Sequence, residues 1–113
     1  MRGENLACKF LKKSKHKILA RNYRCPAGEA DIITIDKKLD QLVFVEVKTR
    51  SSDFHISPES AVDSRKQNRL RNIAKYYSTQ HCIGELAIRF DVIGIAIPQS
   101  GKPAINHIID AFV

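Results

Sequence analysis

Residues 43–49, Val-Phe-Val-Glu-Val-Lys-Thr, decide the fold and carry its chemistry. β-Branched and aromatic residues dominate this stretch, which predicts a strand. Because strand side chains alternate between faces, Glu46 and Lys48 share one face and the three valines share the other. Two charges at the end of so apolar a strand need partners, since burying an unpaired charge is costly.

The stretch before it predicts the other arm of a hairpin. Residues 29–36 are again rich in β-branched residues, and the polar residues 37–40 separate them from a strand over 41–49. A four-residue loop at 37–40 pairs Asp36 with Gln41. A slip of one residue would reverse the faces, so the arrangement of the side chains depends on this loop.

This register brings charged side chains together across the hairpin. Asp31 lies opposite Glu46, and Glu29 lies opposite Lys48, with Cβ atoms about 4.5–5.5 Å apart. Carboxylates that close repel unless a positive group lies between them, and Mg²⁺ is often held by one or two carboxylates. Such an ion activates water for phosphodiester hydrolysis, and Lys48 would orient that water or stabilise charge on phosphorus. A cross-strand ladder of ion pairs explains the same spacing.

Hydrophobic periodicity predicts the other elements and a single α/β domain over residues 1–113. The expected elements are an amphipathic helix over 4–13, a strand over 17–24, a helix from Ser57-Pro58-Glu59 to about residue 80, and strands over 85–97 and 104–112. The order is α-β-β-β-α-β(-β), a mixed sheet flanked by helices. Arg89 and Asp91 share a face of the fourth strand and are expected to pair with each other.

Two helical residues have two interpretations each. Lys66 lies in the middle of an apolar stripe, where a lysine either extends to the edge or reaches an anionic site. Gln67 lies beside it, farther from the stripe. Glu4 borders the apolar face of the first helix, where the N-terminal dipole alone explains an acid. The stripe of the second helix consists of Val62, Leu70, Ile73 and Tyr77.

A net charge of +7, from 19 Lys and Arg against 12 Asp and Glu, is typical of a nucleic-acid-binding domain and equally of a solvated surface. Arg21, Arg24 and Arg50 flank the acids in sequence and are candidates for contacts with the DNA backbone. Arg65 and Arg69, on the second helix, are candidates for phosphate contacts in the same way.

The composition excludes several other classes of protein. The sequence contains no run of 18 apolar residues, the length that would predict a membrane span. Residues 1–5 lack the apolar core of a signal peptide. Three widely spaced cysteines fit a reducing cytoplasm, and their spacing to the histidines is not that of a zinc site. We therefore expect a cytoplasmic protein without a small-molecule cofactor.

The combination of motifs resembles the YraN family of small bacterial proteins, which is similar to the Holliday-junction resolvases of the PD-(D/E)xK nuclease superfamily. The strongest likeness is in Gly-Glu-Ala-Asp-Ile-Ile at 28–33 and Val-Phe-Val-Glu-Val-Lys-Thr-Arg at 43–50. Residues 2–7, 20–24, 57–62 and 89–92 extend it over almost the whole chain. The resemblance implies a restriction-endonuclease-like αβββαβ core.

The resemblance also implies roles for individual residues. Asp31 and Glu46 would be metal ligands, Glu4 would supplement the metal site, and Lys48 would be the catalytic lysine. Lys66, with Gln67 beside it, would be the motif residue of the second helix. Ala30 replaces the proline of the superfamily name, which shapes the turn and carries no chemistry.

The implied activity is Mg²⁺- or Mn²⁺-dependent hydrolysis of DNA, with branched DNA as the implied substrate in repair or recombination. Cutting a junction needs two active sites, so the resemblance implies a homodimer. Two other classes are a nucleic-acid-binding module without turnover and an interaction protein whose acids are structural. The complete set of Asp31, Glu46 and Lys48 favours the enzyme, because a binding module does not need all three.

Overall fold

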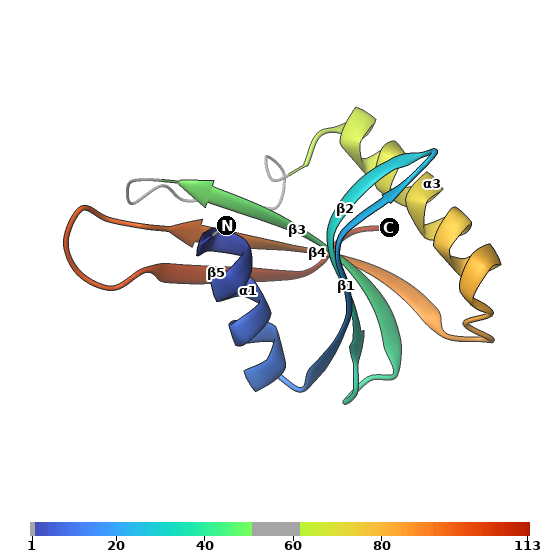
Figure 1. Ribbon diagram of the computed structural model, residues 1–113, viewed down its shortest axis with the longest axis horizontal. Coiled ribbons are helices and arrows are strands. Elements are labelled where there is room, and N and C mark those ends of the chain that lie inside the picture. Colours follow the sequence, from blue (N-terminus) through green and yellow to red (C-terminus); the bar gives the residue numbers. More distant parts are fainter. Residues whose placement is uncertain (1, 51–61) are drawn as a thin grey trace.

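Strand-forming residues build a mixed sheet in the order β1-β2-β3-β4-β5, with a helix packed on each face (Figure 1). The computed structural model describes residues 2–50 and 62–113. Its elements are α1 (Arg2–Lys13), β1 (His16–Cys25), β2 (Gly28–Asp36), β3 (Gln41–Arg50), α3 (Ser64–His81), β4 (Ala87–Ala96) and β5 (Ala104–Phe112). The expected α/β class and element order are confirmed, and the architecture is compatible with a restriction-endonuclease-like core. Neither of these helices is long and apolar enough to cross a membrane.

The central strand β3 is antiparallel to β2 and parallel to β4. A parallel neighbour requires a crossover, and the chain between β3 and β4 includes α3. The β2–β3 ladder runs from Asp36 opposite Gln41 to Ile32 opposite Val45. The predicted loop at 37–40 and its register are therefore confirmed.

The alternation of β3 creates two cores, one on each face of the sheet. Phe44 packs with Ile33 and the buried residues of α3 on one face. Val43 and Val45 pack with Leu11 of α1 on the other. Residues 42–46 of β3 are all buried, because helices cover both faces.

The start of the second helix differs from the expected one. Asp63 is its N-cap: Oδ1 of Asp63 accepts a hydrogen bond from the backbone N–H of Lys66 at 2.9 Å, and Val62 is not helical. A continuous helix from the Ser57-Pro58-Glu59 signal through residue 80 is thus wrong, although that signal itself lies outside the described residues. Leu70, Ile73 and Tyr77 of the predicted apolar stripe are confirmed as buried residues of α3, whereas Val62 is buried but precedes the helix.

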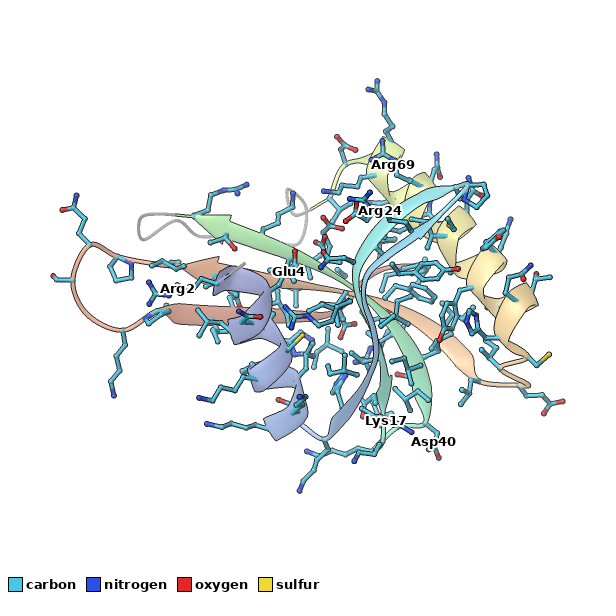
Figure 2. The ribbon with its side chains drawn as sticks, in the orientation of Figure 1. Arg2, Glu4, Lys17, Arg24, Asp40 and Arg69 are labelled. Atoms are coloured by element: carbon cyan, nitrogen blue, oxygen red, sulfur yellow. The ribbon has the colours of Figure 1, made fainter. Side chains whose placement is uncertain are left out.

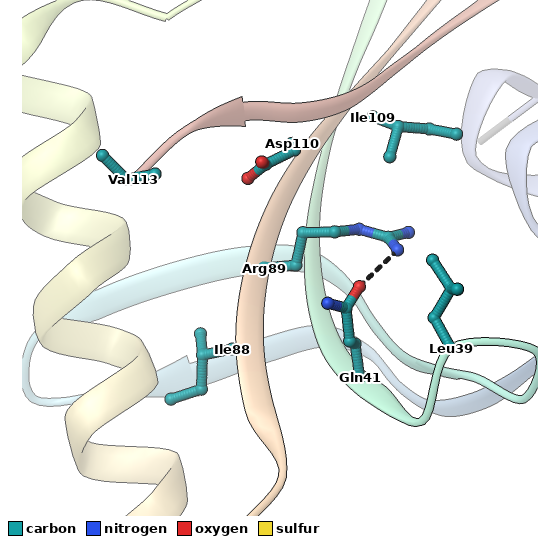
Figure 3. A pocket seen from close by; sticks show the side chains of 7 residues that line it. All are labelled: Leu39, Gln41, Ile88, Arg89, Ile109, Asp110 and Val113. Atoms are coloured by element: carbon teal, nitrogen blue, oxygen red, sulfur yellow. Dashed lines mark hydrogen bonds between the residues drawn. The ribbon is translucent and has the colours of Figure 1, made fainter.

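A buried arginine organises the sheet on the α1 side. Arg89 is 4% exposed, and its guanidinium donates two hydrogen bonds to Asp91, at 2.9 and 2.8 Å. Its Nη1 also donates to Asp36 at 2.9 Å and to Gln41 at 2.8 Å (Figure 3). Burial by itself would raise the pKa of each acid, but the hydrogen bonds outweigh it and lower both pKa values. The predicted Arg89–Asp91 pair is confirmed as part of a larger network.

Two histidines extend this network to the edge strands. Nε2 of His107 lies 2.8 Å from Oδ2 of Asp91. Nδ1 of His16 lies 2.7 Å from the hydroxyl of Thr34, and its Nε2 lies 3.7 Å from Asp36. Burial lowers the pKa of His16. The network therefore takes a side chain from every strand: His16, Asp36, Gln41, Arg89 and His107.

Replacing Arg89 with Met should lower the free energy of unfolding by about 3–5 kcal/mol, because Asp36 and Asp91 would remain buried without a counter-charge. Urea denaturation would measure the loss. The exposed Arg65→Met is the matched control and should change stability by no more than about 0.5 kcal/mol. A similar small effect for both variants would contradict the role given to Arg89.

Candidate active site

Asp31 lies at the point where β2 and β3 separate. The last paired residues of the ladder are Ile32 and Val45. Beyond them β2 continues toward α3, while β3 runs toward the opposite side of the molecule (Figure 1). Oδ2 of Asp31 accepts a hydrogen bond from the backbone N–H of Val47 at 2.8 Å. This side-chain hydrogen bond links β2 to β3 beyond the last backbone pair of the ladder.

Glu46 is the second acid of the site, and it is 6% exposed. Its Oε1 lies 2.7 Å from Nζ of Lys66, which reaches it from the first turns of α3. Burial raises the pKa of Glu46, the hydrogen bond from Lys66 opposes this, and the neighbouring negative charge of Asp31 raises the pKa further. The structure therefore brings Asp31, Glu46 and Lys66 together, and Lys66 reaches an anionic group rather than solvent alone.

Lys48 is half-buried on the same face of β3 as Glu46. Phe44 of this strand packs with the α3 core and Val45 with the α1 core, so alternation places residues 46 and 48 on the α3 face. The predicted face of both charges is thus confirmed. An acid and a lysine two residues apart consequently border the opening between β2 and β3.

Glu29 and Gln67 have partners outside this group. Glu29 is exposed and lies 3.5 Å from Nε of Arg24, its partner across the β1–β2 hairpin. The β2–β3 ladder ends at Ile32 and Val45, so the expected pairings of Asp31 with Glu46 and of Glu29 with Lys48 do not form in it. Asp31 and Glu46 nevertheless interact through their side chains. Gln67 donates from its amide to the carbonyl oxygen of Val62, the residue before the N-cap of α3, at 3.0 Å.

Glu4 is buried in the first turn of α1, the helix on the other face of the sheet. That turn packs closely on the end of β3, since a Cβ atom at Gly3 would overlap the hydroxyl of Thr49. Figure 2 shows Glu4 at this end of the helix. Among residues 2–50 and 62–113, however, no three acids, histidines or cysteines lie close enough together to hold a metal ion. Glu4, Asp31 and Glu46 therefore do not form a three-ligand group among these residues.

The structure separates the candidate DNA-binding arginines into two groups. The stem of Arg69 lies over the β1–β2 turn, where a Cβ atom at Gly28 would come within 2.9 Å of its Cδ. Arg24 is on the same hairpin and has an 81% exposed side chain; both arginines are labelled in Figure 2. Arg21 instead donates to the side chain of Asn5 on α1 at 2.7 Å.

The other two arginines are also at the surface. Arg65 is exposed on α3. Arg50 is exposed at the end of β3, and its Nη1 donates to the carbonyl oxygen of Thr49 at 3.0 Å. Arg65 and Arg69 therefore lie on α3, whereas Arg21 is engaged with α1. Arg24 lies on the β1–β2 hairpin and faces away from the α3 core, because its neighbours Tyr23 and Cys25 pack in that core.

The fold and this site define an α/β domain in which two strands of a mixed sheet diverge around a pair of acids. Comparison with known proteins then identifies the family: the model of the uncharacterised protein family UPF0102 matches residues 3–95, and the chain belongs to this family. The family that the sequence resembles is thereby confirmed.

Members of the family from several bacteria match nearly the whole chain. A UPF0102 protein of Geobacter sulfurreducens is 41% identical over 112 residues, which cover 99% of this chain and 86% of the relative. One from Syntrophomonas wolfei is 46% identical, with 97% and 93% covered. One from Clostridium perfringens is 41% identical, with 97% and 89% covered. The similarity therefore includes both the hairpin that bears the acids and the helix that bears Lys66.

Replacing Asp31 with Ala should reduce the hydrogen-exchange protection of the Val47 amide, because its acceptor is lost at a cost of about 1 kcal/mol. Asp31→Asn is the control, since it keeps an oxygen that accepts the same bond. Exchange followed by NMR would resolve this amide. Equal protection in the two variants would show that the Asp31 side chain does not pair with β3.

Proposed function

We propose that this protein is a metal-dependent nuclease that hydrolyses phosphodiester bonds in DNA. The observation that carries the proposal is the pair of acids, Asp31 and Glu46, at the divergence of β2 and β3, with Lys48 on the same face as Glu46. This arrangement supports the resemblance to the PD-(D/E)xK superfamily, whose name describes two acids and a lysine with this spacing.

The chemistry of the two acids fits a divalent cation. Glu46 is buried beside the negative charge of Asp31, and a lysine ammonium already lies against it, so the position is one that attracts positive charge. Two carboxylates suit Mg²⁺ or Mn²⁺, because such ions keep several waters as ligands. When bound, the ion would neutralise charge on the phosphate and lower the pKa of a water ligand.

The residues of the chain then have separate tasks. Asp31 and Glu46 would hold the ion, and Asp31 is itself oriented by the backbone N–H of Val47. Lys48 would orient the attacking water or stabilise the negative charge that develops on phosphorus. Arg69 on α3 and the exposed Arg24 on the adjoining β1–β2 hairpin would contact phosphates of the DNA backbone.

The resemblance to resolvases extends the proposal to branched DNA as substrate and to a homodimer as the working form. The three widely spaced cysteines support the cytoplasm as the location. A non-catalytic DNA-binding module is the second candidate. The ion pair between Lys66 and Glu46 favours it, because a carboxylate already neutralised by a lysine needs no metal ion.

The decisive assay measures cleavage of duplex, single-stranded and four-way-junction DNA in the presence of Mg²⁺ or Mn²⁺. Wild type should cut at least one substrate, and Asp31→Asn and Lys48→Met should cut it about 10²–10⁴-fold more slowly. Lys75→Met, an exposed position on α3, is the charge-matched control and should behave as wild type. If the wild type binds these substrates without cutting any of them, the binding module is the correct function.

DNA binding without metal ion should depend on Arg69 and not on Arg21. Arg69→Met keeps the aliphatic stem over Gly28 but removes a phosphate contact, so affinity should fall and the salt-dependence slope should decrease by about one. Arg21→Met, whose guanidinium binds Asn5, should leave both unchanged. Fluorescence anisotropy at several salt concentrations would measure this, and equal losses in both variants would contradict the assigned surface.

A further inference from the structure

The side chain of Lys66 crosses from the surface of α3 to a buried acid. The lysine side chain is 36% exposed and that of Glu46 is 7% exposed, and Nζ lies 2.7 Å from Oε1. The residues around Lys66 on α3 that face the sheet, Leu70 and Ile73, are apolar and buried. Glu46 is therefore the anionic partner that draws the ammonium inward from this stripe.

The backbone of Lys66 is held independently of its side chain. Its N–H donates to Oδ1 of Asp63, the N-cap of α3, at 2.9 Å. Leu70 and Ile73 fix the helix on the sheet one and two turns later. Because these contacts do not involve the ammonium, the side chain can leave Glu46 while the helix stays in place.

The charges around Glu46 make the ammonium a substitute for a metal ion. Asp31 adds a second negative charge beside Glu46, and two carboxylates at short range require a positive group. A divalent cation that approached Glu46 would meet Lys66 at Oε1. The cation would either displace the lysine or bind the same carboxylate beside a repelling ammonium. Both outcomes lower the affinity of the site for the cation.

We propose that Lys66 is the resident counter-cation of the acidic pair: it holds Glu46 in the metal-free protein and competes with the divalent ion for that carboxylate. This inference rests on the proposed function, because it concerns the same metal site. It makes Lys66 a positioning residue whose removal tightens metal binding. The structural alternative, a lysine that only supports packing, predicts no change in metal affinity.

Isothermal titration of Mn²⁺ and of Mg²⁺ into the full chain, without DNA, tests this. Lys66→Met, which keeps the apolar stem, should bind about tenfold more tightly, equal to about 1.4 kcal/mol. Lys66→Arg keeps the charge and should remain near wild type. Lys75→Met removes a lysine elsewhere on α3 and should also match wild type, which separates the local effect from net charge.

Thermal unfolding gives a second readout. In EDTA Lys66→Met should melt below wild type, because the acids lose their counter-charge, and added Mn²⁺ should raise its melting temperature by more than that of wild type. If Lys66→Met unfolds during purification, Lys66→Gln replaces it in both measurements. Unchanged or weaker metal binding in the folded variant would overturn the inference.

The inference and the proposed function fail in distinguishable ways. Tighter binding by Lys66→Met without DNA cleavage by any protein would support the counter-cation and defeat the nuclease. Cleavage by wild type with equal metal affinity in Lys66→Met would support the nuclease and overturn the counter-cation. Metal binding by Asp31→Ala as strong as that of wild type, or no binding by any protein, would overturn both.

Discussion

The burial of Arg89 between two carboxylates is the constraint on which the rest of the sheet depends. Its hydrogen bonds to Asp36 and Asp91 join β2 to β4 across the central strand, and Gln41 and the histidines bring in the other strands. A buried charge must keep its partners, so the relative positions of all five strands are fixed at this end of the sheet. Asp31 precedes Asp36 by five residues in β2, where β2 and β3 separate, and the acids lie at that opening.

The carboxylates near the two ends of the β2–β3 pair differ in their partners and in their pKa values. At the loop end each carboxylate receives several donors, and the pKa values of Asp36 and Asp91 are lowered. At the open end Glu46 has one lysine and an acidic neighbour, and its pKa is raised. The first arrangement is saturated with internal partners and suits a structural role. The second retains an unfavourable interaction between acids, as is common where a ligand completes the site.

The features predicted well from sequence are those that depend on neighbours in the chain. The alternation of residues 43–49 and the four-residue loop gave the right register, because a burial pattern on two faces permits only one pairing. Lys66 was correctly placed among apolar residues by helical spacing.

The predictions that failed depend on contacts outside the local pattern. The extension of the hairpin register to Glu29 was wrong because it assumes a continuous ladder. The contact of Arg21 with α1 was not predicted, because its partner Asn5 lies 16 residues away in sequence, outside any local pattern. The full Arg89 network was missed because Asp36 lies 53 residues away in sequence, beyond any local pattern.

The Arg89 network also sets the acidity that the fold can tolerate. Burial lowers the pKa of His16, so below pH of about 6.5 the unfolded chain takes up a proton more readily than the folded chain, and stability declines. Asp36 and Asp91 act in the same direction: below pH of about 3.8 the unfolded carboxyls protonate first, and the stabilisation from Arg89 is lost as pH falls toward the lowered folded values. This cluster on the α1 face thus makes the sheet most stable near neutral pH. As the pH falls, stability is lost first through the histidine and then through the carboxylates.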